Sequence, residues 1–285
     1  MSDSGPGAAA PPQQIAMTLR WDVGDKELPL EFSLPAQPVE PQAILPALRQ
    51  LVNDVVAASV EELENHGRHV TCKAGCGACC RQVVPIADFE AHAIAALIEN
   101  MPEERRNHVR ERFADAERRL AAARPPDEMI AAINGDDRYD FAVEYFKIGV
   151  ACPFLEDESC SIYTDRPLIC REYLVYTPVE RCAKVGEPGI GVVPINRASK
   201  ALYRLSTMHN TQAELRVPLS LVPYWTARNP ARFPMTNGAE WVMRFVAAMA
   251  QADAEEARAE QRARESQSTG AGTADGAVPA PDAKA

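Results

Sequence analysis

The sequence predicts a mainly α-helical chain with a small β-hairpin, folded around a cysteine-rich loop core. Three patterns favour this class. Several segments repeat apolar residues at helical spacing, one N-terminal stretch alternates apolar and polar residues, and the cysteines cluster. Neither internal repeats nor alternating strand–helix units occur, so neither a solenoid nor a parallel sheet is expected.

The N-terminal part predicts a hairpin followed by one long helix. Residues 16–34 alternate apolar and polar side chains in two runs, with Gly24-Asp25-Lys26 between them. This pattern is typical of a hairpin with one buried face. Residues 41–69 then place apolar side chains at helical spacing. Pro46 lies in the first turns, where proline is tolerated, and Gly67 loosens the end of the helix.

Further helices follow, separated by prolines and loops. A short extended piece is expected at 83–86, with Asp88 as the N-cap of the next helix. The segment 190–235 is interrupted by prolines, and we assign no element to it. The expected helices after the first cover 88–99, 102–123, 139–148, 167–173 and 238–265.

Composition and pattern divide the chain into five parts. Both ends are rich in Ala, Gly, Pro and Ser, so they bury little surface and we expect them to be disordered. The parts are a disordered tail at 1–14, the hairpin and long helix at 15–69, a cysteine-cluster domain at 70–185, a helical or irregular extension packed on the core at 186–265, and a disordered tail at 266–285.

The overall composition is that of an ordinary globular protein. The 285 residues are 46% hydrophobic and 25% charged, with a formal net charge of -10. Because an acidic chain repels phosphate backbones and anionic lipid, we expect it to bind neither nucleic acid nor a membrane surface. We also expect no transmembrane helix, since no uncharged apolar run of about 18 residues occurs. Residues 1–14 do not resemble a signal peptide, so we expect a cytoplasmic protein.

The eight cysteines are the most informative residues. They are too few for a disulfide scaffold in a chain of this length. Four lie within the nine-residue run CKAGCGACC, and three more follow in proline-rich loops. In a reducing compartment, clustered thiols usually bind metal or carry out redox chemistry. The candidate metal ligands are Cys72, Cys76, Cys79, Cys80, Cys152, Cys160 and Cys170.

Residues beside the cysteines fit such a site. Gly75 and Gly77 allow unusual dihedral angles and let backbone N–H groups approach the sulfurs. Four thiolates around zinc or an iron–sulfur core leave a net negative charge. The guanidinium groups expected to balance that charge are those of Arg81, Arg166 and Arg171.

Other nearby residues are harder to assign. Cys182 lies farther along the chain, and the sequence does not decide whether it joins the site. His66 and His69 could extend the site, but they also suit a helix C-terminus, where positive charge is favourable. The residues expected to pack and orient the cysteine loops are Tyr163, Arg166 and Tyr173.

The two cysteine regions together resemble a known family. The run CKAGCGACC, followed by CPFLEDESCSIYTDRPLICR, is similar to the bacterial cysteine-cluster family of zinc- or iron-chelating domains. The resemblance covers roughly residues 70–175. It implies that the seven candidate cysteines bind metal, and some members of the family are described as iron–sulfur proteins. One branch is associated with lysine N-methylation of flagellin.

The spacing of the cysteines favours an iron–sulfur cluster over zinc. Zinc sites usually take paired knuckles from two loops, whereas the second region here spaces its cysteines widely and unevenly. The spacing Cys72-x3-Cys76-x2-Cys79 also matches radical S-adenosylmethionine enzymes. Those enzymes usually have an aromatic residue where this chain has Ala78, and they need βα units that are missing here.

Three functions remain open at this stage. The first is a metalloprotein with a redox or metal-handling role. The second is a module that binds a protein partner and whose loops are held together by a structural zinc ion. The third is a cluster-dependent protein-lysine N-methylase, which only the resemblance suggests. Motifs for phosphate binding, serine hydrolysis or zinc proteolysis are not found in the sequence.

Overall fold

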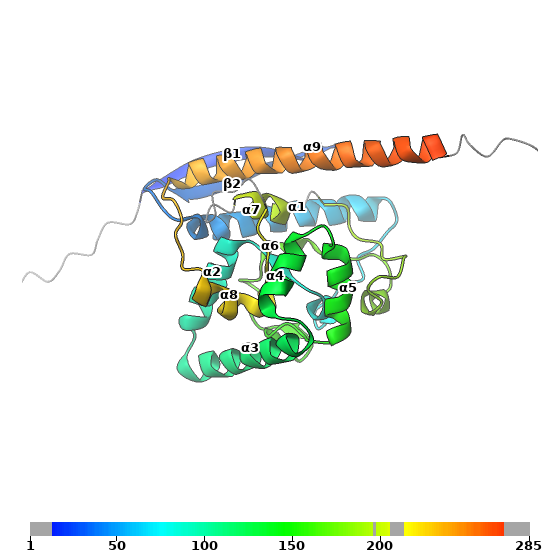
Figure 1. Cartoon of the computed structure of the whole chain (residues 1–285). Coiled ribbons are helices and arrows are strands. Elements are labelled where there is room, and N and C mark those ends of the chain that lie inside the picture. Colours follow the sequence, from blue (N-terminus) through cyan, green and yellow to red (C-terminus); the bar gives the residue numbers. More distant parts are fainter. Residues whose placement is uncertain (1–12, 196–197, 206–213, 271–285) are drawn as a thin grey trace, which may run out of the picture.

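The computed structural model describes residues 13–195, 198–205 and 214–270. Within these ranges the chain is mainly helical, and its strands form two-stranded antiparallel sheets. The predicted class, a mainly α-helical fold with a small hairpin, is therefore confirmed. Figure 1 shows the hairpin and the last helix together along one side of the molecule, with the other helices below them.

The hairpin consists of β1 (Gln14–Val23) and β2 (Lys26–Pro35). Val23 pairs with Lys26, so the turn contains two residues rather than the expected three. Gly24 adopts a φ of +56° in this turn, a conformation that costs glycine little. The alternating apolar side chains face α1 and α9, which gives the hairpin its single buried face.

The long helix is shorter than predicted at both ends. A 3-10 turn, η1 (Pro41–Ile44), precedes α1 (Leu45–Asn65). The α-helix begins later because Pro46 occupies its first turn, where the missing N–H costs nothing. It ends before Gly67, whose φ of +72° is left-handed.

Helix α1, together with the turn before it, has the length and hydropathy of a membrane-spanning helix. Within the described chain, Pro41–Asn65 is the segment whose length and hydropathy would suffice to cross a membrane. In this fold its apolar stripe lies in the largest hydrophobic cluster, against the hairpin, α6 and α9. A core helix of this kind meets the same criterion.

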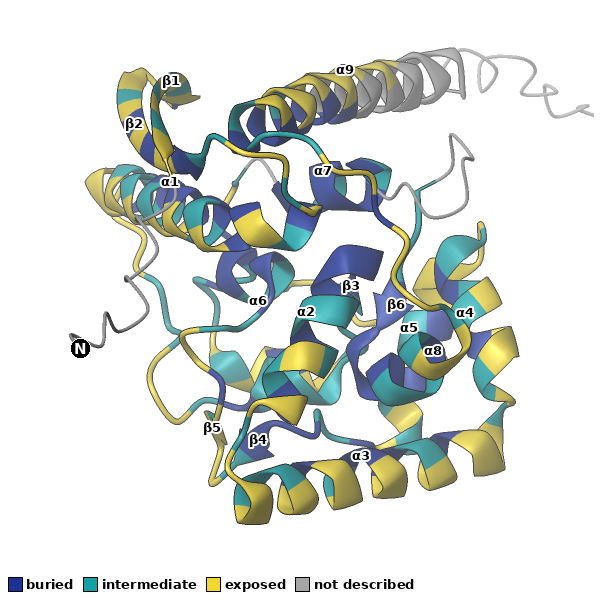
Figure 2. Cartoon of the chain, turned by 90° about the vertical axis from the view of Figure 1, so that its left-hand side faces the viewer, coloured by how far each residue is buried: buried dark blue, intermediate teal, exposed yellow. Residues whose placement is uncertain are grey.

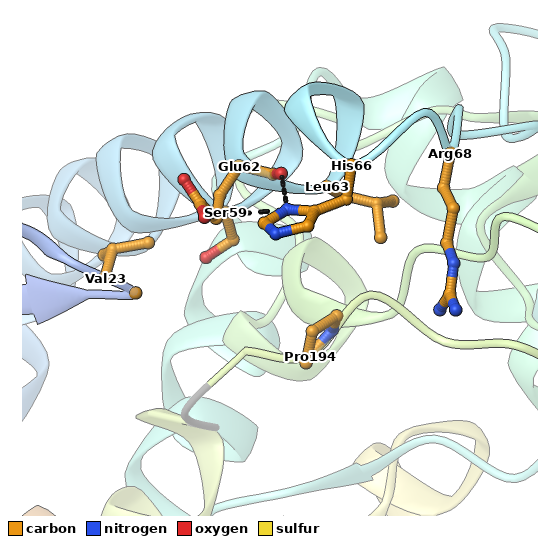
Figure 3. A pocket seen from close by; sticks show the side chains of 8 residues that line it. Val23, Ser59, Glu62, Leu63, His66, Arg68 and Pro194 are labelled. Carbon is orange, nitrogen blue, oxygen red and sulfur yellow. Dashed lines mark hydrogen bonds and ion pairs between the residues drawn. The ribbon is translucent and has the colours of Figure 1, made fainter.

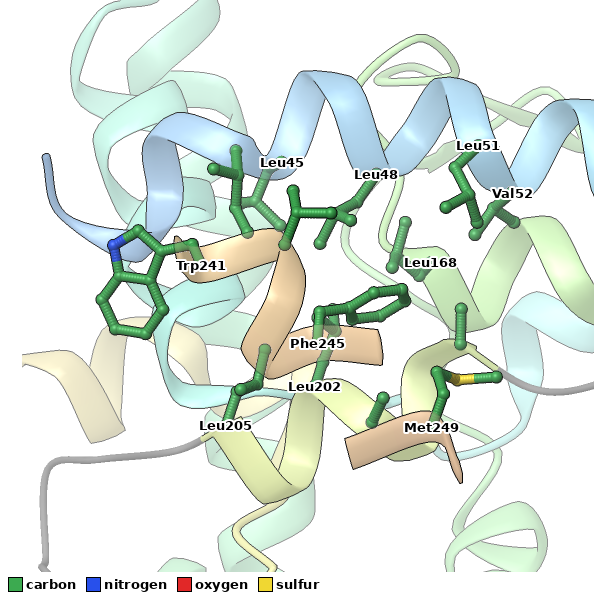
Figure 4. Close-up of a cluster of buried hydrophobic side chains, with 14 of the residues drawn as sticks. Leu45, Leu48, Leu51, Val52, Leu168, Leu202, Leu205, Trp241, Phe245 and Met249 are labelled. Carbon is green, nitrogen blue, oxygen red and sulfur yellow. The ribbon is translucent and has the colours of Figure 1, made fainter. Parts of the chain in front are cut away.

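The upper core is formed by α1, α7 (Ala198–Leu205) and α9 (Gly238–Gly270). Leu48, Leu202 and Phe245 are fully buried between these helices (Figure 4). The indole N–H of Trp241 donates to the backbone oxygen of Val39 at 2.9 Å, which ties the last helix to the segment before η1.

The lower half contains two smaller hydrophobic clusters, and the exposed faces of its helices are turned outward (Figure 2). The short strands β3 (Pro85–Ile86) and β6 (Val217–Pro218) pair beneath the upper core. The helices of this half are α2 (Asp88–Glu99), α3 (Glu103–Ala123), α4 (Pro126–Asn134), α5 (Arg138–Ile148) and α8 (Val222–Arg228).

Several sequence expectations need correction. Helices α4, α7 and α8 were not expected, and the last helix extends to Gly270, into part of the expected C-terminal tail. Asp88 is the first residue of α2, and Ala87 occupies the N-cap position. The remaining tail residues, 1–12 and 271–285, lie outside the described residues.

Candidate metal centre

The first cysteine run forms a tight turn followed by a short 3-10 helix. The N–H of Cys76 donates to the oxygen of Lys73, and Gly75 adopts a φ of +79° in this turn. Cys79 and Cys80 then lie in η2 (Ala78–Arg81). The turn carries Cys76, and the short helix that follows carries Cys79 and Cys80.

Gly77 is required by close packing. A Cβ at this position would lie 2.6 Å from a methyl carbon of Leu155 and 2.7 Å from a carboxylate oxygen of Glu158. These two residues belong to the second cysteine region, where β4 (Leu155–Glu156) pairs with β5 (Ser159–Cys160). The missing side chain therefore lets the two cysteine regions approach each other.

Backbone hydrogen bonds hold the second region against the first. The N–H of Cys152 donates to the oxygen of Cys80 at 2.7 Å. Cys170 lies in α6 (Leu168–Glu172), whose first N–H, that of Leu168, donates to the buried carboxylate of Glu90 at 3.0 Å. Because Glu90 belongs to α2, the position of Cys170 depends on that helix as well.

Cys182 also joins this region, a point that the sequence did not decide. It is buried in η3 (Val179–Ala183), and its backbone oxygen accepts a hydrogen bond from the side-chain amide of Gln82. On the same side, the sulfur of Cys72 accepts a hydrogen bond from the N–H of Val175 at 3.3 Å. No sequence motif indicated this contact.

The thiols form two groups, and the charge of Cys79 affects thiols in both of them. Burial is the main cause that raises the pKa of thiols in both groups, and a thiolate at Cys79 adds to the rise because like charges repel. Within each group the thiols also act on one another. We call Cys79, Cys80, Cys152, Cys160 and Cys170 the inner thiols, and Cys72, Cys76 and Cys182 the outer thiols.

Within the inner thiols, one group is prepared to ionise before the others. A hydrogen bond with the Cys80 side chain and, to a smaller extent, the charge of Arg166 lower the pKa of Cys79 to about 7 against the opposing effect of burial. The same bond, together with burial, raises the pKa of Cys80. Burial raises the pKa of Cys152 to about 12 and that of Cys170 well above its usual value. A metal cation would favour the charged form of all four.

Of the three arginines expected to balance the thiolates, Arg166 fits best. Its charge helps to lower the pKa of Cys79, and it opposes the rise that burial causes in the pKa of Cys160. Arg81 lies next to Cys80 in sequence, but its guanidinium pairs with Glu158 at 2.5 Å. Arg171 lowers the pKa of Cys160 weakly, and its N–H groups are bonded to other residues.

Two further expectations concern the flanking residues. Tyr163 is 61% exposed, so it does not pack between the cysteine loops as expected; its ring lies 4.1 Å from the Arg166 guanidinium. The His66 Nδ1 lies 2.8 Å from the backbone oxygen of Glu62, and His69 lies near Glu64, so both histidines face α1 carboxylates.

His66 also lines a pocket with a volume of about 570 Å³. Figure 3 shows this pocket between the hairpin turn at Val23, the end of α1 and Pro194, with Arg68 at its far side. None of the eight cysteines lines it, so this pocket is separate from the thiols.

The donor chemistry fits a soft metal. All eight cysteines have free thiols, and thiolates suit zinc and iron–sulfur clusters. In the described part of the chain, however, no three Cys, His, Asp or Glu side chains converge closely enough to hold a metal ion. Several of the thiol side chains would have to turn toward a common centre when metal binds.

Comparison with known proteins identifies the cysteine region. Residues 71–185 match a family model described as a "putative zinc- or iron-chelating domain", the family that the two cysteine segments CKAGCGACC and CPFLEDESCSIYTDRPLICR resemble. The matched segment contains all eight cysteines, Cys182 included. Neither the curated proteins nor the solved structures give a significant match to the chain.

Proposed function

Because residues 71–185 belong to the cysteine-cluster family of zinc- or iron-chelating domains, we propose that this chain binds an iron–sulfur cluster through its thiols. The observation that carries the proposal is that the segment matching a zinc- or iron-chelating domain contains all eight cysteines, each with a free thiol. Bringing several thiolates close together costs free energy because their negative charges repel, and a bound metal cation offsets this cost.

We favour an iron–sulfur cluster because the inner thiols come from several separate segments of the chain. They come from η2, from the loop at Cys152, from β5 and from α6, rather than from two knuckles. Iron–sulfur clusters accept such ligand sets, and hydrogen bonds and nearby charges tune them. Such a cluster suits electron transfer or metal handling in a reducing cytoplasm, which would keep the thiols reduced.

Anaerobic purification of the full chain tests this proposal. We expect brown protein with visible absorption that bleaches on dithionite addition, and iron and acid-labile sulfide in comparable amounts. Bound zinc without iron would leave a metal site but contradict the cluster. Protein without iron and without zinc, from cells grown with both metals, would contradict metal binding altogether.

Serine substitutions test the ligand assignment. Cys79→Ser and Cys170→Ser should lower the bound metal sharply, because each removes an inner thiol from the candidate centre. Cys182→Ser, which removes an outer thiol, should lower it less. Metal analysis of the folded variants is the measurement, and an equal loss in all three would contradict the division into inner and outer thiols.

A zinc-stapled interaction module is the second candidate. It is favoured by the small amount of regular structure that carries the cysteines, which a metal would have to hold in place. In that case a chelator should unfold the segment 71–185, and dithionite should change no visible absorption. Lysine methylation of a partner protein is tested by S-adenosylmethionine binding in calorimetry.

A further inference from the structure

The structure links the candidate metal centre to a helix that lies outside the matched domain. Helix α1 ends before residue 71, where the match to the family begins. Two of its polar side chains, Arg49 and Asn53, are four residues apart and therefore lie on the same face of the helix. Arg49 contacts Asp165 in the turn that carries Arg166, and Asn53 contacts Arg171 in α6, whose guanidinium bonds back to that turn.

Each of the two contacts fixes a different part of that turn. Arg49 donates to the carboxylate of Asp165 at 2.8 Å. Asn53 accepts a hydrogen bond from the buried guanidinium of Arg171 at 2.9 Å. Arg171 in turn donates to the backbone oxygens of Arg166 at 3.1 Å and of Thr164 at 2.5 Å. The backbone at Arg166 is thus held through one intermediate residue.

The charges in this region do not balance without the thiols. The guanidinium groups of Arg49, Arg166 and Arg171 belong to one hydrogen-bonded region around this turn. Two carboxylates, those of Asp165 and of the buried Glu90, interact with cations of this group. A group of cations that is partly removed from water requires further negative charge nearby, and thiolates would supply it.

Arg166 is the cation of this group that faces the thiols. Its Nε atom is buried and has no hydrogen-bond partner among the described residues, while its guanidinium lies against the Tyr163 ring at 4.1 Å. A buried donor without a partner costs free energy. A thiolate or a sulfide of a bound cluster could accept its proton when the metal is present.

We propose that α1 is part of the metal centre: Arg49 and Asn53 are positioning residues that hold Arg166 beside the inner thiols, where it stabilises the metal–thiolate complex. This inference rests on the proposed function, but it concerns residues that lie outside the family match. The matched segment alone would then contain the ligands without the helix that positions their counter-charge.

A double-mutant cycle tests the proposal. The affinity for Zn²⁺, used as a simple probe, is measured under anaerobic conditions by competition with a chromophoric chelator. Arg166→Gln should weaken binding about 10-fold, the lower end for residues that support metal ligands. Asn53→Ala should weaken it less. In the Arg166→Gln background, Asn53→Ala should have no further effect on the affinity, because Asn53 acts on metal binding only through the guanidinium of Arg166, which that variant lacks.

Matched controls separate positioning from general damage. Gln50→Ala removes an exposed α1 side chain that bonds to Asp54 on the same helix, and it should not change the affinity by more than a small factor. Arg166→Lys, which keeps the charge, should recover part of the loss. Circular dichroism confirms that each variant folds.

The results separate the two hypotheses. If the wild-type chain binds neither Zn²⁺ nor an iron–sulfur cluster, the proposed function itself fails. If the wild type binds metal while Arg166→Gln binds equally well, the inference is wrong and the function stands. Equal effects of Asn53→Ala in both backgrounds would show that Asn53 acts on stability alone, which also overturns the inference.

Discussion

A single buried carboxylate links two helices of the lower half to the thiols. Glu90 accepts hydrogen bonds from the N–H groups of Ala87 at 3.1 Å and of Leu168 at 3.0 Å. It thereby caps α2 and the start of α6, whose next turn contains Cys170. Burial raises the pKa of Glu90, although both hydrogen bonds favour its charged form. In the folded protein, two hydrogen bonds from backbone N–H groups therefore replace the water that would otherwise solvate this carboxylate.

We predict that Glu90→Gln destabilises the protein by about 2 kcal/mol, since an amide keeps only one acceptor and leaves a buried N–H unpaired. Urea unfolding of the metal-free chain measures the effect. Glu99→Gln, on the exposed end of the same helix, should change stability by less than about 0.5 kcal/mol. Equal effects at both positions would contradict the role given to Glu90.

At the scale of single residues, the sequence predicted the ligand types but not their supports. The cysteines are close in sequence, so their clustering was visible. The contacts of Glu90 with Leu168, or of Asn53 with Arg171, span 78 and 118 residues. Pattern and spacing carry no information about such pairs, which only the packing of α1, α2 and α6 creates.

Among the secondary-structure elements, α9 packs the upper core most extensively. The sequence predicted its packed half from the helical spacing of apolar residues, and Trp241, Val242, Phe245 and Met249 are indeed buried. Helices α4, α7 and α8 were missed because they are short and because prolines begin α4 and α8. Such helices depend on tertiary packing rather than on a long amphipathic pattern.

We predict that Phe245→Ala lowers the free energy of unfolding by about 3–5 kcal/mol, because a fully buried ring leaves a cavity between α1 and α7. Met243→Ala, two residues earlier on the exposed side of α9, should cost less than about 0.5 kcal/mol. Thermal unfolding followed by circular dichroism is the measurement. A similar cost at both positions would show that this face of α9 is not packed.

On the scale of the whole molecule, the matched segment does not contain a complete core. The largest hydrophobic cluster combines the hairpin, α1, α7 and α9 with only a few residues of the segment 71–185, such as Phe89 and Leu168. A second cluster takes Val217 and Trp225 from beyond the segment. The cysteine region is therefore enclosed by parts of the chain that come before and after it.

We predict that a fragment of residues 71–185 does not fold cooperatively, even with Zn²⁺ or reconstituted iron and sulfide, because it lacks α1, α7, α8 and α9. The full chain should unfold in a single sharp transition. Circular dichroism with increasing temperature distinguishes the two. A sharp transition in the fragment would mean that the metal alone supplies enough folding free energy.

The bond between Trp241 and Val39 joins residues 202 positions apart, and it has a consequence for how the protein is made. At about 5–20 residues per second, a ribosome needs roughly 10–40 s to produce the chain between them. Until α9 has been made, the apolar side of α1 has no partner helix on this face, and all eight cysteines have been synthesised once the ribosome has passed Cys182. Newly made chains thus pass through a stage in which all the cysteines are present but α9 has not yet been synthesised. In that interval they depend on chaperones and on a reducing environment.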